Sequence, residues 1–111
     1  MEIYFRTMKL QKACSCAARM NAEWGQAMAR KLQQRLMELK AAETLSDISR
    51  LPPARCHELT GNLKGLLSVD LVHPFRLIFA VANEPVPCKP DGGVDWTRVD
   101  KVEVTDIMDT H

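Results

Sequence analysis

The sequence predicts an α+β fold with the order β-α-α-β-β-β(-β), in which a helical hairpin packs on one face of a small, largely antiparallel sheet. Two stretches in the first half carry apolar residues at three- and four-residue spacing, which is the period of an amphipathic helix. Short apolar or alternating runs follow in the second half, separated by turns that contain Gly and Pro. The chain has 111 residues, so we expect one domain over residues 1–111.

The amino-terminal half predicts one strand and two helices. Residues 1–6 alternate in hydropathy and should form a strand. Thr7 can cap a helix over residues 8–20, which Asn21 would end. A second helix is expected over residues 22–42, because apolar side chains line one stripe of it. This stripe consists of Met28, Leu32, Leu36 and Leu39. Two helices with so short a connection form an antiparallel pair that needs a sheet to cover its apolar side.

The carboxy-terminal half predicts the rest of the sheet. Residues 44–53 suggest a brief helical turn that ends at two prolines. A glycine-flanked turn over residues 61–65 should join two strands into a hairpin. Residues 83–95 hold three prolines and an Asp-Gly-Gly sequence, which is typical of a surface loop. The expected strands cover residues 57–60, 67–71, 75–82 and 99–107. The sheet face away from the helices is left open for function.

Charge is distributed unevenly along the chain. The net charge of +1 argues against a protein that coats nucleic acid through a uniform basic surface. Residues 1–64 hold eleven Lys or Arg against six Asp or Glu, whereas residues 65–111 hold four against eight. This asymmetry fits local phosphate contact and complementarity within the chain equally well. Arg30, Lys31 and Arg35 form a candidate basic patch for RNA or an acidic partner, with a solvated helix face as the simpler interpretation.

The sequence also bears on compartment and metals. No apolar run approaches the roughly 20 residues of a membrane-spanning helix, and the first residues lack a secretory signal. We therefore expect a cytoplasmic protein without membrane contact, whose four cysteines are reduced. Cys14 and Cys16 form a C-x-C pair within a predicted helix, where they point to different faces. A zinc site there is the weaker alternative, and we expect no metal ion and no cofactor.

Polar groups suited to acid-base chemistry lie on or beside the predicted strands. A histidine exchanges protons near pH 7, and an arginine can bind a phosphate through two N–H groups. Such parts suit metal-free RNA cleavage, in which the ribose 2′-hydroxyl attacks the adjacent phosphate while the enzyme moves two protons. The candidate residues are His57, Thr60, Lys64, Arg76, Asp109 and His111.

Each candidate also has a structural interpretation. His57 can serve only as a hydrogen-bonding strand residue, and Arg76 can simply form an ion pair with Asp70 or Asp106. The final histidine lies at a chain end, where residues commonly fray. Two aromatic residues, Trp24 and Trp96, are expected to anchor the core or its edge rather than to stack on a ligand.

Several sequence blocks together resemble one toxin family. They are HELTGNLKG over residues 57–65, LSVDLVHPFRLIF over 67–79, DGGVDW over 91–96 and VEVTDIMDTH over 102–111. The helical stretch AMARKLQQRLMELKAAETLSDI over residues 27–48 extends the likeness to nearly the whole chain. With these blocks the chain resembles the HigB-like branch, also called plasmid maintenance system killer, of the RelE/ParE toxin superfamily.

The resemblance implies a toxin of a type II toxin–antitoxin pair that enters the ribosomal A site and cuts mRNA without metal. A helix-turn-helix, HigA-like antitoxin would neutralise it, and the complex would reach operator DNA through that antitoxin. By position, His57 and Arg76 match the family's strand histidine and arginine, while Asp109 and His111 match its carboxy-terminal acidic and histidine positions. Arg76 would then bind the phosphate, the two histidines would move protons or orient the ribose, and Asp109 would set a histidine's tautomer.

The chain departs from the family pattern at four positions. Thr60 stands where the family often has lysine, Leu63 where it has a basic residue, and Leu67 where it has an aromatic one. Thr110 replaces the tyrosine of the usual Asp-Tyr-His ending. Lys64 would partly replace the missing charge and, with Thr60 and Thr110, contact the substrate. These departures keep two alternatives open: a weakly active or inactive binding module that engages an antitoxin, and a ParE-like gyrase inhibitor.

Overall fold

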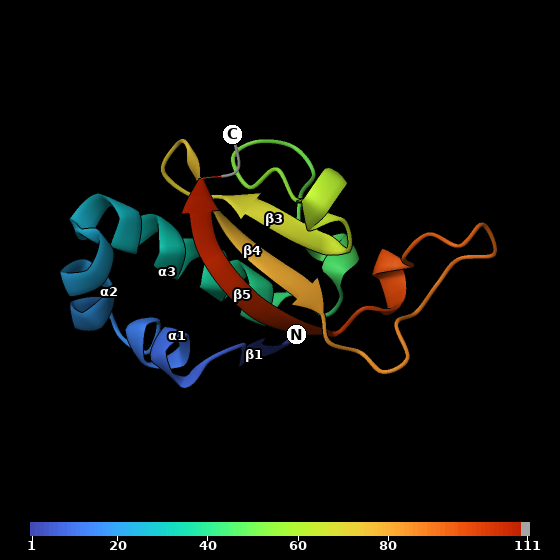
Figure 1. Cartoon of the computed structure of the whole chain (residues 1–111), viewed down its shortest axis with the longest axis horizontal. Coiled ribbons are helices and arrows are strands. Elements are labelled where there is room, and N and C mark those ends of the chain that lie inside the picture. Colours follow the sequence, from blue (N-terminus) through green and yellow to red (C-terminus); the bar gives the residue numbers. More distant parts are fainter. Residues whose placement is uncertain (110–111) are drawn as a thin grey trace.

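The structure is a computed structural model that describes residues 1–109, and it consists of three helices packed on a five-stranded sheet (Figure 1). In Figure 1 helix α3 crosses behind the sheet, and α1 and α2 lie at its left end. The main elements are β1 (Glu2–Phe5), α1 (Met8–Ala13), α2 (Ala17–Trp24), α3 (Gln26–Ala41), β2 (His57–Glu58), β3 (Leu66–Asp70), β4 (Phe75–Val81) and β5 (Lys101–Asp109). Short 3-10 turns occur at η1 (Leu45–Asp47), η2 (Gly61–Leu63) and η3 (Trp96–Arg98). The predicted α+β class is confirmed.

The sheet has the strand order β1-β5-β4-β3-β2. Strands β2 to β5 form antiparallel neighbours, and β1 joins β5 as a parallel strand at one edge. The largely antiparallel sheet is therefore as expected. Its other edge is the two-residue strand β2, which is shorter than the predicted run because η2 begins directly after Thr60.

The core lies between α3 and one face of the sheet. Alternate residues of a strand point to the same side, so each strand contributes every second residue to this layer. Helix α3 contributes the buried Met28, Ala29, Leu32 and Leu39. The facing strand residues are Leu67, Val69, Leu77, Phe79, Val102 and Val104.

The predicted helix boundaries were wrong. The single helix expected over residues 8–20 is broken at Cys14–Cys16, where the Ser15 hydroxyl donates to the Lys12 carbonyl and Cys16 adopts an extended backbone. Serine competes for backbone groups in this way and thereby weakens a helix. Asn21 does not end a helix, because α2 continues to Trp24. The chain instead turns at Gly25, whose φ of +84° is accessible to glycine without steric cost.

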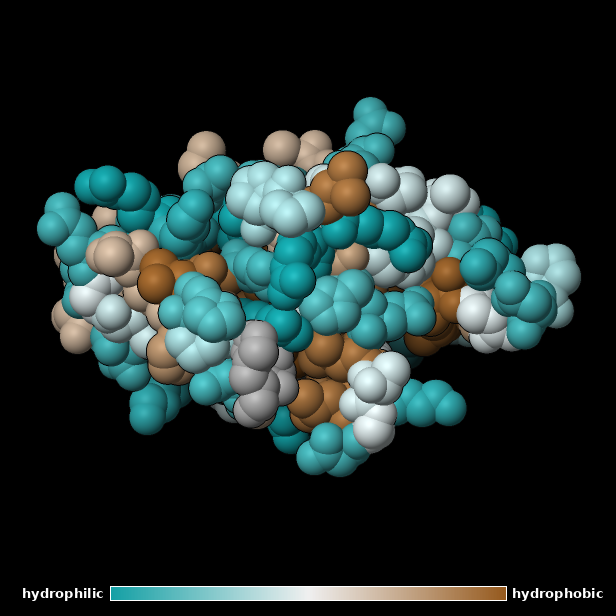
Figure 2. All heavy atoms as spheres, turned by 90° about the horizontal axis from the view of Figure 1, so that it is seen from above, coloured by the Kyte–Doolittle hydropathy of each residue, from teal (hydrophilic) through white to brown (hydrophobic). Residues whose placement is uncertain are grey.

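The face away from the helices is less open than expected. Ser68 and Ile78 lie opposite each other on that face, and they are 0% and 1% exposed. Hydrophilic residues cover most of the side of the molecule seen in Figure 2, with apolar residues gathered in separate patches. Within residues 1–109, no helix is long and apolar enough to cross a membrane.

Candidate active site

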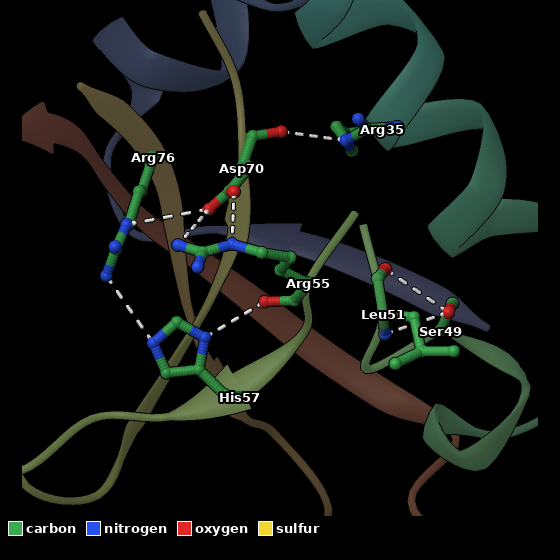
Figure 3. A network of polar contacts seen from close by, with 7 residues as sticks. All are labelled: Arg35, Ser49, Leu51, Arg55, His57, Asp70 and Arg76. Atoms are coloured by element: carbon green, nitrogen blue, oxygen red, sulfur yellow. Dashed lines mark hydrogen bonds and ion pairs between the residues drawn. The ribbon is translucent and has the colours of Figure 1, made fainter. Parts of the chain in front are cut away.

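A polar cluster lies where β2, β3 and β4 meet, on the sheet face away from α3 (Figure 3). His57 pairs with Ser68, and Asp70 pairs with Arg76 across the β3–β4 hairpin. Because side chains two residues apart share a face, His57, Asp70 and Arg76 all lie on the same side of the sheet. The structure thus brings together the strand histidine and the strand arginine that the sequence singled out.

The hydrogen bonds of His57 define which ring nitrogen carries the proton. Nδ1 lies 2.9 Å from the backbone carbonyl oxygen of Arg55, which can only accept, so Nδ1 must donate. Nε2 lies 3.4 Å from Nη1 of Arg76, which can only donate. These partners favour the tautomer with its proton on Nδ1 and a lone pair on Nε2. The geometry therefore presents a proton acceptor beside a guanidinium group.

Asp70 connects two arginines on this face. Its carboxylate accepts from Nε of Arg55 at 2.6 Å and from Nη2 of the same residue at 3.5 Å. The Nε of Arg76 lies 3.6 Å from Oδ1 of Asp70, and the Arg76 side chain is 13% exposed. The hydrogen bond that Arg55 donates to Asp70 raises the pKa of Arg55. Of the two ion pairs considered for Arg76, the structure shows the one with Asp70.

Arg55 also acts through its backbone. Its φ of +46° is unusual for a residue with a side chain. In this conformation its carbonyl meets His57 while its guanidinium reaches Asp70, as Figure 3 shows. Sequence reasoning missed both Arg55 and the linking role of Asp70, because neither the backbone conformation nor the long-range pairing has a local pattern.

Arg35 anchors the cluster from the other layer of the fold. Its side chain is 1% exposed, its Nε donates to the Asp70 backbone carbonyl at 2.7 Å, and its Nη1 contacts both carboxylate oxygens of Glu38. The proposed inclusion of Arg35 in a basic RNA-binding patch with Arg30 and Lys31 was wrong, since a buried guanidinium cannot meet RNA. Arg30 is exposed and Lys31 is half-buried on the same helix.

Thr60 and Lys64 flank η2 and are exposed. Within the described part of the chain, neither contributes a hydrogen bond or ion pair to the cluster around His57. Their predicted substrate contacts remain a prediction. Leu67 is 1% exposed and belongs to the core beside α3. An aromatic residue at position 67 would therefore pack inside the protein, so its absence removes no base contact in this chain.

The carboxy-terminal candidates are placed only in part. Asp109 ends β5 and lies opposite Phe75, one residue out of phase with the pair formed by Met108 and Arg76. The strand register alone therefore does not direct Asp109 to the face that bears Arg76. The predicted roles of Thr110 and His111 fall outside the described residues, and the role of Asp109 stays a prediction.

Cys56 lies between Arg55 and His57 in the chain, and the other three cysteines lie in other segments. Cys14 and Cys56 are buried, and Cys16 and Cys88 are exposed. Burial raises the pKa of the Cys14 thiol to about 11 and that of Cys56 to about 12. Over residues 1–109, no three His, Cys, Asp or Glu side chains gather as a metal-binding group would.

Comparison with protein families shows the relationship that the sequence blocks suggested. The model of the RelE-like toxin of the type II toxin–antitoxin system HigB matches residues 20–87, which is more than half of the chain. The chain belongs to the HigB-like toxin family. The matched region contains His57, Asp70 and Arg76, so the cluster lies within the family domain.

A solved structure shows the same fold as this HigB-like toxin. The YoeB-YefM complex from Staphylococcus aureus includes a chain that aligns over 100% of the present chain and 97% of its own length, with a TM-score of 0.55 and 14% identity. At that identity the likeness concerns the fold alone. Comparison with curated proteins found no match.

Proposed function

We propose that this HigB-like toxin is a ribosome-dependent endoribonuclease that cuts mRNA without metal and thereby inhibits translation. The observation that carries the proposal is the 3.4 Å approach of the Arg76 guanidinium to Nε2 of His57. A proton acceptor and a phosphate-binding cation serve the first half of RNA transesterification. Asp70 supports them because its carboxylate contacts both Arg76 and Arg55. The backbone carbonyl of Arg55 in turn lies within hydrogen-bond distance of Nδ1 of His57.

The first half of the reaction follows from this geometry. The scissile phosphate accepts hydrogen bonds from the N–H groups of Arg76 and thereby draws Nη1 away from His57. Nε2 then takes the proton of the ribose 2′-hydroxyl as its oxygen attacks phosphorus. A new P–O2′ bond forms, and the additional negative charge on the phosphoryl oxygens is stabilised by Arg76.

The second half needs a proton donor. The P–O5′ bond breaks, the leaving 5′-oxygen gains a proton, and the products carry a 2′,3′-cyclic phosphate and a 5′-hydroxyl. We assign the donor to His111, with Asp109 setting its tautomer, because the family resemblance implies these roles. Thr60, Lys64 and Thr110 contact the substrate in this scheme. The cation of Lys64 would face the RNA backbone from the loop that precedes β3.

The same proposal defines the partners. The toxin acts in the cytoplasm on mRNA held by the ribosome and is neutralised by a helix-turn-helix, HigA-like antitoxin. Operator DNA is reached only through that antitoxin, and no membrane takes part. The family match and the toxin–antitoxin complex among the similar solved structures support an antitoxin partner.

One observation favours the alternative of an inactive binding module. Arg76 is held by Asp70 and contacts His57, so the phosphate has to compete with contacts that already exist. A test is to add the purified chain to a reconstituted translation mixture with a defined mRNA, with and without ribosomes. Discrete cuts that appear only with ribosomes support the proposal. Intact mRNA with a folded chain that still binds the antitoxin would favour the binding module.

A further inference from the structure

A second cationic group lies outside the cluster just described. The guanidinium of Arg50 stacks on the Trp96 ring, 3.6 Å from its centroid. Trp96 is 6% exposed, and its Nε1 donates to Oε1 of Glu58 at 3.2 Å. Arg50 itself is exposed. The indole is thus held at its Nε1 edge by Glu58 and covered on one face by the guanidinium of the exposed Arg50.

The Arg50 site is open to a ligand and biased toward an anion. It borders a pocket of 470 Å³ that Ser46, Ser49, Thr97 and Lys89 also line, and Lys89 forms an ion pair with Asp91. The one carboxylate in the lining, Asp95, already accepts from Thr97 and forms an ion pair with Arg98. Among the residues that the structure describes, no carboxylate forms an ion pair with Arg50.

The backbone places this site beside the strand that bears His57. The Ser49 carbonyl accepts from Cys56 N–H at 2.9 Å, and the Leu51 carbonyl accepts from Arg55 N–H at 3.0 Å. Figure 3 shows Ser49 and Leu51, the neighbours of Arg50, next to the segment that leads into His57. The edge strand β2 carries both His57 and Glu58, the hydrogen-bond partner of Trp96.

We propose that Arg50, stacked on Trp96, is a second RNA contact that binds a nucleotide flanking the cleavage position. The guanidinium plane offers its free face to a base and its edge N–H groups to a phosphate. The backing indole holds this plane in place and reduces the conformational entropy that binding would cost. An acidic peptide could use the charge but has no need for a flat stacking surface, so single-stranded RNA fits better. The inference rests on the proposed function, since it concerns the same substrate.

The test uses the full chain and a fluorescein-labelled, 2′-O-methyl single-stranded oligonucleotide that cannot be cleaved. Fluorescence anisotropy measures its Kd for wild type, Arg50→Ala, Arg50→Lys and Arg19→Ala. We expect Arg50→Ala to raise Kd roughly tenfold and to lower the salt slope by about 0.7. Arg50→Lys keeps the charge but loses the plane, so it should recover the salt slope and only part of the affinity. Arg19→Ala, which removes an equal charge from the exposed surface of α2, should stay close to wild type.

The outcome separates this inference from the proposed function. If the chain cuts no mRNA but binds the oligonucleotide in a way that depends on Arg50, the second RNA contact is supported and the nuclease activity is refuted. Normal cutting with equal Kd values for wild type and Arg50→Ala would overturn the inference alone. The inference would also be overturned if the wild-type chain did not bind the oligonucleotide, or if Arg50→Ala weakened only the binding of an acidic antitoxin segment. Circular dichroism of each variant confirms that folding is unchanged.

Discussion

The buried guanidinium of Arg35 in α3 donates a 2.7 Å hydrogen bond to the backbone carbonyl of Asp70 at the end of β3. This contact joins the helical layer to the strand position that organises Arg55 and Arg76 on the opposite side of the sheet. The carbonyl of Asp70 faces the helix while its carboxylate faces the cluster, as Figure 3 shows. Asp70 thus links α3 to the candidate active site.

Replacing Arg35 should destabilise the protein. Arg35→Ala leaves the Asp70 carbonyl without this donor and Glu38 without its partner, which should cost about 2 kcal/mol of unfolding free energy. Arg35→Lys should restore little of this, because one ammonium lacks the planar fork that serves both groups. Urea denaturation measures the change. Arg30→Ala on the exposed side of the same helix is the control, and equal stability of the two alanine variants would contradict the structural role.

The four thiols should differ in reactivity at pH 8. The backbone N–H of Arg19 lowers the pKa of exposed Cys16, whereas burial raises that of Cys14 to about 11 and that of Cys56 to about 12. Only the thiolate reacts with disulfide reagents, so Cys16 and exposed Cys88 should be modified first in the native protein. Mass spectrometry of partially modified protein locates the label. Four thiols modified at one common rate would show that the assigned burial is incorrect.

Arg76 should contribute to the chemical step rather than to folding. Arg76→Ala should lower the single-turnover cleavage rate roughly hundredfold, because a group that stabilises developing charge is removed. Arg76→Lys should recover part of the rate, since a point charge replaces two directed N–H groups. Asp70 retains Arg55 as a partner in either variant. Arg19→Ala on the exposed surface of α2 is the charge-matched control, and a cleavage rate that falls equally in this control would mean that net charge alone matters.

The sheet and the approach of His57 to Arg76 follow from local patterns. Alternating residues and the glycine-flanked turn identify strands, and strands bring side chains of one phase to one face. Helix boundaries were harder, because the break at Ser15 depends on a hydroxyl that competes with the backbone. Gly25 is the kind of residue that commonly ends a helix, but the helix end was predicted at Asn21 instead.

The supporting residues of the site could be predicted only in part. Arg35 lies three residues after Leu32 and four before Leu39, so the sequence itself placed it on the buried stripe of α3. Its charge instead suggested an exposed residue of a basic patch with Arg30 and Lys31. The roles of Arg55 and Asp70 depend on a positive φ and on contacts between segments, which no local pattern encodes. The stacking of Arg50 on Trp96 likewise arises only in the folded chain.

The chemical nature of the cut ends tests the nuclease directly. Ribosome-bound mRNA treated with the wild-type chain should yield 2′,3′-cyclic phosphates and 5′-hydroxyls, because the 2′-oxygen displaces the 5′-oxygen. His57→Ala, folded by circular dichroism, should yield these ends at least a hundredfold more slowly, at the lower end of the effect expected for a general base. Fragments with 5′-phosphates and 3′-hydroxyls, or cutting by His57→Ala at the wild-type rate, would contradict a reaction in which His57 takes the 2′-hydroxyl proton beside Arg76.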